Sequence, residues 1–274
     1  MIRGPTIRRV WTACLLAVRV YGAAPEDLTV PSTAPAYTAA SVVPAATQAA
    51  GALAPNTIAT IYGANLAYDT HAVAPADLVG GALPTSVDGV SVIMYGLYCG
   101  LFYVSPTQIN FLVPYSLVLT SAPLQVTRQG VAGPAVTIPM ALTAAAFFEW
   151  NGNLAIAEHA DGSLITAAAP AQAGEVVVLY AAGLGRTSPD QVEDRVPSSA
   201  APILYGSELQ ILLNGVALPA GSVIYAGVTP GFAGLYQINV QLPNPLPEDP
   251  QIQVAIGTQT SPPAILLPTQ GASP

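Results

Sequence analysis

One strand-like segment occurs twice in this chain and constrains its fold more than any other feature. The first copy spans residues 105–114 around Gln108-Ile109-Asn110, and the second spans residues 234–243 around Gln237-Ile238-Asn239. In both copies apolar residues alternate with polar ones and a proline closes the run, a pattern typical of a short strand with one buried face. Its repetition indicates an internal duplication. We therefore predict two similar domains, each containing one copy.

The residues around the two copies match as well. Residues 176–184 repeat residues 58–66, with Tyr180 in the place of Tyr62. Glycine and proline separate runs rich in β-branched residues, which favours short strands joined by turns over helices. We predict strands at 57–62, 90–95, 101–104, 108–113, 124–127 and 135–139 in the first half, and at 176–184, 209–213, 223–226, 236–242 and 251–257 in the second. The economical architecture for each half is an antiparallel β-sandwich.

The two halves differ mainly in one loop. From Tyr62 to Gln108 the chain advances 46 positions, whereas from Tyr180 to Gln237 it advances 57, and the extra length lies largely in residues 186–206. Two copies with different loops favour two domains over a solenoid. The predicted order is a signal peptide (1–24), an Ala/Pro/Thr-rich linker (25–50), a first sandwich repeat (51–140), a connector with a hairpin around Asp161-Gly162 (141–171), a second repeat (172–268) and a tail (269–274).

The first 24 residues have the composition of an export signal. Arg3, Arg8 and Arg9 precede a short apolar core at 10–18, and small residues follow at 22–24. An apolar core this short does not predict a permanent membrane span, so we expect none after signal removal. The rest of the chain has no lysine and sets three arginines against 15 acidic residues. Such a surface repels nucleic acid, and we predict a secreted, cell-surface or periplasmic bacterial protein without a nucleic-acid partner.

The chain resembles a known family at several specific motifs. In the first half these are Ile-Tyr-Gly-Ala-Asn-Leu at 61–66, Leu-Pro-Thr-Ser at 83–86, Gly-Val-Ser-Val at 89–92 and Phe-Tyr-Val-Ser-Pro at 102–106 with Gln-Ile-Asn-Phe at 108–111; in the second half they lie at 176–180, 183–185, 226–227 and 231–240. Over about residues 50 to 268 the chain is similar to the Solibacter-type uncharacterised C-terminal domain of secreted acidobacterial proteins. It departs from that pattern at Tyr95-Gly96, where the family usually has Asn-Gly.

This resemblance implies a fold but no chemistry. The family is similar to immunoglobulin-like IPT/TIG sandwiches, so it implies an all-β chain of two tandem antiparallel sandwich domains. The family has no established activity, and the resemblance therefore supplies no catalytic, cofactor-binding or metal-binding residue.

Few residues suggest catalysis. His159, Asp161 and Ser163 invite a Ser-His-Asp interpretation, but they lie within five positions in one turn and no Gly-x-Ser-x-Gly elbow is present. His71 lies in a Pro/Ala-rich loop without a motif. Cys99, next to an apolar run, is expected to be a buried hydrophobe, because no motif places a base beside it. We expect no catalytic residue.

Metal and lipid attachment have weak signals. Asp190, Glu193 and Asp194 form the one acidic cluster, which suits calcium by ligand type but fits no calcium-loop spacing, so the alternative is a solvated loop partly neutralised by nearby arginines. Cys14 follows too little apolar sequence for a lipoprotein signal. Two histidines and one usable cysteine do not make a conventional zinc site. We predict neither a metal nor a cofactor.

Two classes of function remain open. The first is a non-catalytic secreted or surface module that binds protein or polysaccharide or acts as a spacer, and the second is a cryptic hydrolase; an outer-membrane barrel is a weaker third, because the strands are short and proline-rich. Tyrosines in or beside strands are either core residues or a polysaccharide platform: Tyr62, Tyr103, Tyr180, Tyr225 and Tyr236. For Asn110 and Asn239 we expect a structural role in which amides fix neighbouring loops through backbone groups, with a binding ladder as the alternative.

Overall fold

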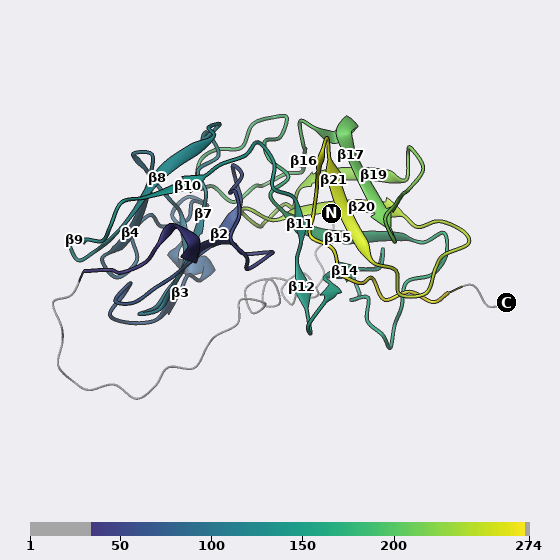
Figure 1. Cartoon of the computed structure of the whole chain (residues 1–274), viewed down its shortest axis with the longest axis horizontal. Helices are drawn as coiled ribbons and strands as arrows, with labels where there is room; N and C mark the ends of the chain where they lie inside the picture. The colour runs from purple at the N-terminus through teal and green to yellow at the C-terminus, as the bar shows by residue number, and fades with distance from the viewer. Residues whose placement is uncertain (1–33, 272–274) are drawn as a thin grey trace.

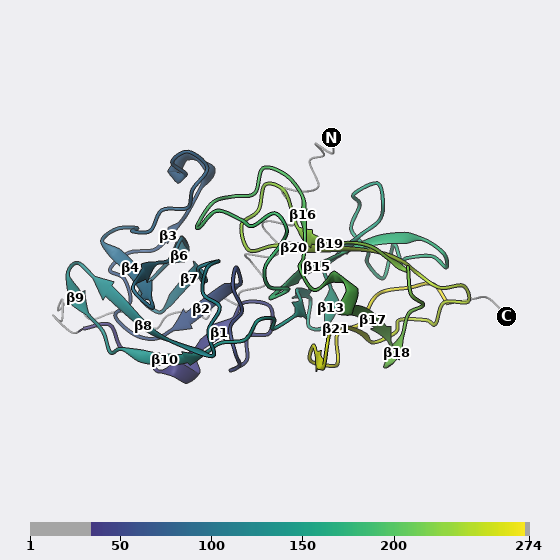
Figure 2. The same ribbon diagram turned by 90° about the horizontal axis from the view of Figure 1, so that it is seen from above.

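The computed structural model describes residues 34–271, so the predicted signal peptide and the last three residues lie outside it. The regular secondary structure of the described chain consists almost entirely of antiparallel strands, which form two lobes side by side (Figures 1 and 2). Short 3-10 helices occur at η1 (Ala39–Ser41), η2 (Pro75–Asp77) and η3 (Gly206–Glu208). The fold class is therefore all-β, with two tandem antiparallel sandwiches.

The first sandwich consists of two sheets. One has the order β1 (Val42–Pro44), β2 (Ile58–Tyr62), β7 (Gln108–Leu112), β6 (Leu101–Val104) and β3 (His71–Ala72). The other has the order β10 (Val136–Pro139), β8 (Ser121–Arg128), β4 (Val90–Met94) and β5 (Leu97–Tyr98), with β9 (Val131–Ala132) also paired to β8. Inward residues of both sheets, such as Ile61, Phe111 and Leu124, share one fully buried core. Burial of each such side chain contributes roughly 1.5–3 kcal/mol, which holds the two sheets face to face.

The second sandwich repeats this plan. Its larger sheet has the order β11 (Ala146–Phe147), β15 (Val176–Ala182), β20 (Tyr236–Gln241), β19 (Val223–Val228) and β16 (Ala201–Pro202), with β14 (Ala157–Glu158) also paired to β15. Its smaller sheet has the order β18 (Val216–Ala217), β17 (Leu209–Leu213), β21 (Ile252–Ile256) and β22 (Gln259–Thr260), and a separate pair joins β12 (Glu149–Trp150) to β13 (Leu154–Ala155). Val177, Ile238 and Val254 belong to its core.

The duplication extends to strand register. Tyr62 lies opposite Gln108 across β2 and β7, and Tyr180 lies opposite Gln237 across β15 and β20. Both repeats also break register at the same place, once between Leu101 and Tyr103 and once between Val223 and Tyr225. An extra residue at equivalent places is a bulge carried by both copies. The strands predicted from alternation are therefore confirmed, with ends that differ by a few residues.

The linker prediction for residues 25–50 is wrong for the part that the structure describes. Residues 42–44 form β1, which pairs with β2 at the edge of the first sheet, and Val42, Val43 and Ala46 are buried. This strand was not predicted, because it is only three residues long and lies in an Ala/Pro-rich stretch. The expected tail also packs, since Thr269 is buried and its hydroxyl donates to the carbonyl of Pro247 over 2.7 Å.

The connector is part of the second sandwich. β11 and β14 both pair with β15, so residues 146–158 extend the larger sheet. The predicted turn at Asp161-Gly162 forms, and Ile165 N–H donates to the carbonyl of Ala157 across it. The sheet extension was not predicted because these strands have only two residues each.

Candidate functional site

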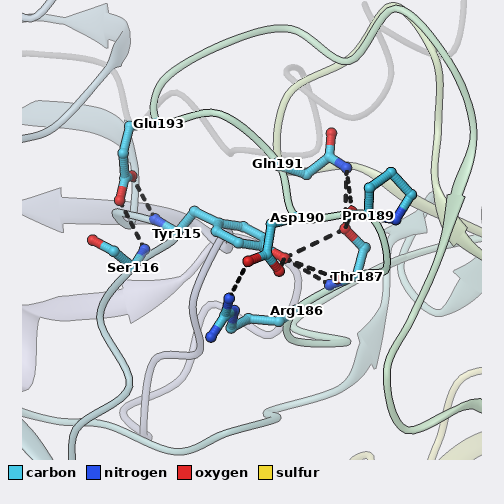
Figure 3. A network of polar contacts seen from close by, with 8 residues as sticks. All are labelled: Tyr115, Ser116, Arg186, Thr187, Pro189, Asp190, Gln191 and Glu193. Carbon is cyan, nitrogen blue, oxygen red and sulfur yellow. Dashed lines mark hydrogen bonds and ion pairs between the residues drawn. The ribbon is translucent and has the colours of Figure 1, made fainter.

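The most elaborate polar site lies where the two sandwiches meet. Residues 186–196, which we call the clamp loop, come from the longer loop of the second repeat and reach residues 81–116 of the first. Figure 3 shows its centre, with Tyr115 of the first repeat placed among clamp-loop side chains. Ser, Pro and Asp at 188–190 are typical turn residues, which favours an irregular path for the loop.

Tyr115 is the first-repeat residue around which the clamp loop closes. It is buried, and its hydroxyl donates to Asp190 Oδ1 over 2.9 Å while accepting the backbone N–H of Thr187 over 2.9 Å (Figure 3). Arg186 pairs with the other oxygen of Asp190 and lies 5.2 Å from the centre of the Tyr115 ring. The Tyr115 side chain thus contacts a carboxylate, a backbone amide and a guanidinium of the clamp loop at once.

Glu193 makes a two-pronged contact with the first repeat. Its Oε2 accepts the N–H of Tyr115 over 2.7 Å, and its Oε1 accepts the N–H of Ser116 over 2.8 Å (Figure 3). Hydrogen bonds from N–H groups to a carboxylate are about twice as strong as neutral ones. The side chain therefore fixes both the distance and the angle between the loop and residues 115–116.

Asp194 makes a further carboxylate contact between the clamp loop and the first repeat. Its Oδ1 accepts the N–H of Gly100 over 2.7 Å, and its carbonyl accepts the N–H of Leu83 over 2.8 Å. Burial raises the pKa of Asp194 to about 6; the Gly100 hydrogen bond opposes this rise and the charge of Glu193 adds to it. Asp194 also has a φ of 53°, a left-handed conformation that Asp and Asn tolerate better than most residues.

A second contact joins the repeats behind the clamp loop. The fully buried Tyr236 accepts a hydrogen bond from Asn56 Nδ2 over 3.0 Å and donates to the carbonyl of Gly185. Burial raises the pKa of Tyr236 well above its ordinary value. Gly234 is required here, because it has a φ of 73° and a Cβ would lie 2.6 Å from Ile58.

Apolar contacts complete the junction. Leu83, Phe102 and Leu112 of the first repeat form a buried cluster with Ala233 of the second. A second cluster joins first-repeat alanines at 45–46 to second-repeat side chains: Phe148, Tyr180 and Leu235. The two sandwiches are therefore joined by buried apolar surface as well as by polar contacts, which favours a fixed relative orientation.

The expectation of a solvated acidic loop is corrected by these contacts. Asp190, Glu193 and Asp194 each point to a different donor of the first repeat, and the last two are only partly exposed. Within residues 34–271 no group of three or more His, Cys, Asp or Glu side chains lies close enough to hold a metal ion. The sequence showed the extra loop length and its acids, but nothing in it showed which surface they would meet.

The histidine candidates do not assemble a triad with Ser163. His159 Nδ1 bonds Glu175 over 2.5 Å and its Nε2 bonds the carbonyl of Ala169 over 3.2 Å, while the Ser163 hydroxyl donates to Asp161 over 2.7 Å. Partial burial lowers the pKa of His159, but the bonds to Glu175 and Ala169 outweigh it and the net shift is upward. The His159 ring therefore connects Glu175 to the backbone at Ala169, and neither of its nitrogens bonds Ser163.

His71 and Cys99 occupy different surroundings. His71 lies 3.4 Å from Asp77 and 3.1 Å from Asp88, and hydrogen bonds to these two carboxylates raise its pKa. Cys99 is fully buried, and burial raises the pKa of its thiol well above the usual value. Its interpretation as a small buried hydrophobe is confirmed.

The amides of the duplicated strand bond to each other. Gln108 Nε2 donates to Asn110 Oδ1 over 2.9 Å, and Gln237 Nε2 donates to Asn239 Oδ1 over 3.1 Å. The expected bonds to loop backbone are thus replaced by a side-chain pair along each strand. Residues two apart on one strand face the same side, which brings the two amides together.

The strand tyrosines are not an exposed platform. Tyr180 and Tyr236 are buried, and Tyr62, Tyr103 and Tyr225 are half-buried. The equivalent residues Tyr62 and Tyr180 both donate to side-chain oxygens, Gln48 Oε1 over 2.6 Å and Glu158 Oε2 over 2.9 Å. Between residues 34 and 271 the exposed tyrosines are others, at 68, 95 and 98.

One pocket of about 250 Å³ lies between the repeats, on the side of residues 47–52 and 141–145. Alanine, glycine and threonine line much of it, and neither His71 nor His159 contributes to it. In the described part of the chain, no helix is long and apolar enough to cross a membrane.

Comparisons with known proteins reach only distant structures. No family model and no curated protein matches the chain. Among solved structures it is similar to a surface glycan-binding protein of Prevotella bryantii (12% identity, TM-score 0.26, covering 86% of this chain and 42% of that one) and to the extracellular region of plexin A4 (10%, 0.27, 92% and 20%). It is also similar to the tandem Ig repeats of Dlar (11%, 0.22, 87% and 96%). TM-scores this low carry no argument about function.

Proposed function

We propose that this chain is a non-catalytic bacterial module, secreted or displayed at the cell surface, that binds a protein or a glycan or acts as a spacer. The junction between the sandwiches carries the proposal. The clamp loop commits its three carboxylates to structural hydrogen bonds across the junction. Such a rigid junction suits a module that holds the surfaces of its two domains in a fixed relative arrangement. We also propose membership in the Solibacter-type family, on the motifs given above, and export by residues 1–24.

The fixed joint is tested by removing the Glu193 carboxylate. Glu193→Ala leaves the N–H groups of Tyr115 and Ser116 without their acceptor. We expect the free energy of unfolding to fall by about 1.5–3 kcal/mol, since the lost bonds are to a charged group. Small-angle scattering should show a broader distribution of interatomic distances as the sandwiches gain freedom.

Glu208→Ala is the matched control, because Glu208 is an exposed glutamate of the same repeat. It should leave both readouts as in the wild type. Unchanged scattering and stability in Glu193→Ala would remove the rigid joint as the basis of the proposal. The hydrolase alternative is tested separately with chromogenic esters and glycosides: turnover that His159→Ala abolishes would overturn the non-catalytic assignment.

A further inference from the structure

The two repeats carry equivalent hairpins with different turn residues. Tyr95-Gly96 joins β4 to β5, and Asn214-Gly215 joins β17 to β18, each as a two-residue loop. The φ values are 51° and 81° in the first turn and 50° and 78° in the second. Two positive φ values are the requirement of a type I′ turn, for which Asn-Gly is the preferred sequence. Tyr95 therefore adopts the same backbone as Asn214 without the residue type that favours it.

The side chain of Asn214 stabilises its turn by a hydrogen bond, whereas the side chain of Tyr95 does not. Asn214 Oδ1 accepts the N–H of Gln251 over 2.9 Å, which ties the turn to β21. The equivalent position in the first repeat is Pro123, whose carbonyl accepts the N–H of Tyr95 but which has no N–H to donate. Within residues 34–271 the Tyr95 side chain makes no hydrogen bond, and 57% of the residue is exposed. A large side chain in the left-handed region costs about 1–2 kcal/mol.

A strained and exposed aromatic residue without an internal partner points to an external contact. The residues around Tyr95 indicate what kind of ligand would make that contact. Tyr98, two residues beyond the turn, is 56% exposed and stands opposite Ile93 on the outward side of the sheet. The outward positions of β4, β8 and β10 lie beside it and are Ser91, Ile93, Ser121, Pro123, Gln125, Thr127, Thr137 and Pro139.

We call Tyr95, Tyr98 and these outward positions the hairpin face. It contains no Asp, Glu, Lys, Arg or His, although the chain as a whole is strongly acidic. Hydroxyl and amide side chains make up most of it, Tyr95 and Tyr98 lie at its β4–β5 end, and Ile93 stands opposite Tyr98. This differs from the contiguous apolar centre, with charges at the rim, that a protein partner usually requires.

We propose that the hairpin face binds a neutral polysaccharide. Tyr95 and Tyr98 supply ring faces on which the C–H side of a pyranose can stack, and the hydroxyls of Ser91 and Thr127 supply donors and acceptors for its hydroxyls. Gln125 adds its amide oxygen as an acceptor, because its Nε2 donates to the carbonyl of Gly133. An uncharged ligand suits a face without side chains that are charged at neutral pH, and the net negative charge of the chain repels uronate or sulfate groups. The proposal rests on the non-catalytic binding function proposed above and gives its ligand class.

Affinity electrophoresis tests this assignment directly. The full chain is run in gels containing mixed-linkage β-glucan, arabinoxylan or galactomannan as neutral probes, and alginate as an anionic one. We expect at least one neutral polymer to retard the wild type, and Tyr95→Asn and Tyr98→Ser to bind it about tenfold more weakly. Tyr95→Asn should also raise the melting temperature, because it restores the preferred turn residue. Lost binding in that variant cannot then be attributed to misfolding.

Val216→Ser is the matched control, since Val216 is an exposed residue of the equivalent hairpin, and it should bind like the wild type. Three outcomes would overturn the assignment: retardation by none of the neutral polymers, retardation by alginate alone, or equal retardation of wild type and both tyrosine variants. If the Tyr95→Asn variant is more stable but the wild type binds no glycan, the hairpin face would be assigned to a protein partner instead. Reducing ends are measured in parallel incubations, because cleavage would contradict the non-catalytic function, whereas the tyrosine variants alone decide the hairpin face.

Discussion

The two copies of the bulged strand pair, β6–β7 and β19–β20, share a register but not an environment. The bulge residue Phe102 is 5% exposed and packs in the junction, whereas its counterpart Ile224 is 59% exposed. The amide pair differs in the same sense, since Asn110 is buried and Asn239 is half-buried. One backbone plan therefore supports two surfaces. The neighbouring elements, and not the repeat itself, decide which outward face is removed from water.

The largest expected difference between the copies concerns the bulge residues. Phe102→Ala removes a ring from the junction cluster that includes Leu112 and Ala233. We expect the free energy of unfolding to fall by about 3–5 kcal/mol. Ile224→Ala, at the equivalent position, should change it by no more than about 0.5 kcal/mol because the side chain is largely in solvent. Urea unfolding of the two variants measures both values.

Similar losses in the two variants would show that the bulge is stabilised by the strand itself, and the contrast between buried and open copies would fail. A useful extension is Phe102→Leu, which keeps most of the apolar contact. It should recover much of the loss if packing, and not backbone geometry, is responsible.

A smaller difference is expected for the amide pairs. Asn110→Ala leaves Gln108 Nε2 without its acceptor in a buried position, and we expect a loss of about 1–3 kcal/mol. Asn239→Ala exposes Gln237 to water, which can replace the lost bond, so the loss should stay below about 1 kcal/mol. Thermal unfolding of both variants checks the order. Unchanged stability combined with lost ligand binding would assign the motif to recognition.

The sequence predicted the strands because alternation and turn residues are local signals. The duplicated Gln-x-Asn segments and the runs at 58–62 and 176–182 depend on which side chains face the core, and a period of two records this directly. The two-residue strands of the connector and the three-residue β1 were missed, because so few residues show no period. Their pairing depends on neighbours distant in sequence.

The junction could not be predicted for the same physical reason. Contacts such as Glu193 with Tyr115 join residues 78 positions apart and depend on how two domains dock. The sequence marked Asp190, Glu193 and Asp194 as unusual by charge but not by partner. The exposed pair Tyr95 and Tyr98 was equally hidden, although the unusual Tyr-Gly turn was a local signal that could have singled it out.

The smallest effect is expected from Asp194, and it tests what the longer loop of the second repeat adds. Asp194→Asn keeps an oxygen that can accept the N–H of Gly100, and Asn tolerates the left-handed backbone. The folded protein holds the Asp194 proton to about pH 6, whereas the unfolded chain releases it near the ordinary value of 3.8. A raised folded-state pKa contributes stability that is complete below the unfolded value and is lost as the pH rises through the folded one.

The melting temperature of Asp194→Asn relative to the wild type should therefore increase from about pH 4 to about pH 7. The amide has no proton to lose, while the wild type must either ionise in the junction or open it. Circular dichroism melts at several pH values measure this difference, and Glu208→Ala, which removes an exposed carboxylate, corrects for general charge effects. A constant difference across the range would mean that water reaches Asp194 freely. The clamp loop would then hold the sandwiches chiefly through Glu193 and Tyr115, and the joint would be insensitive to mild acid.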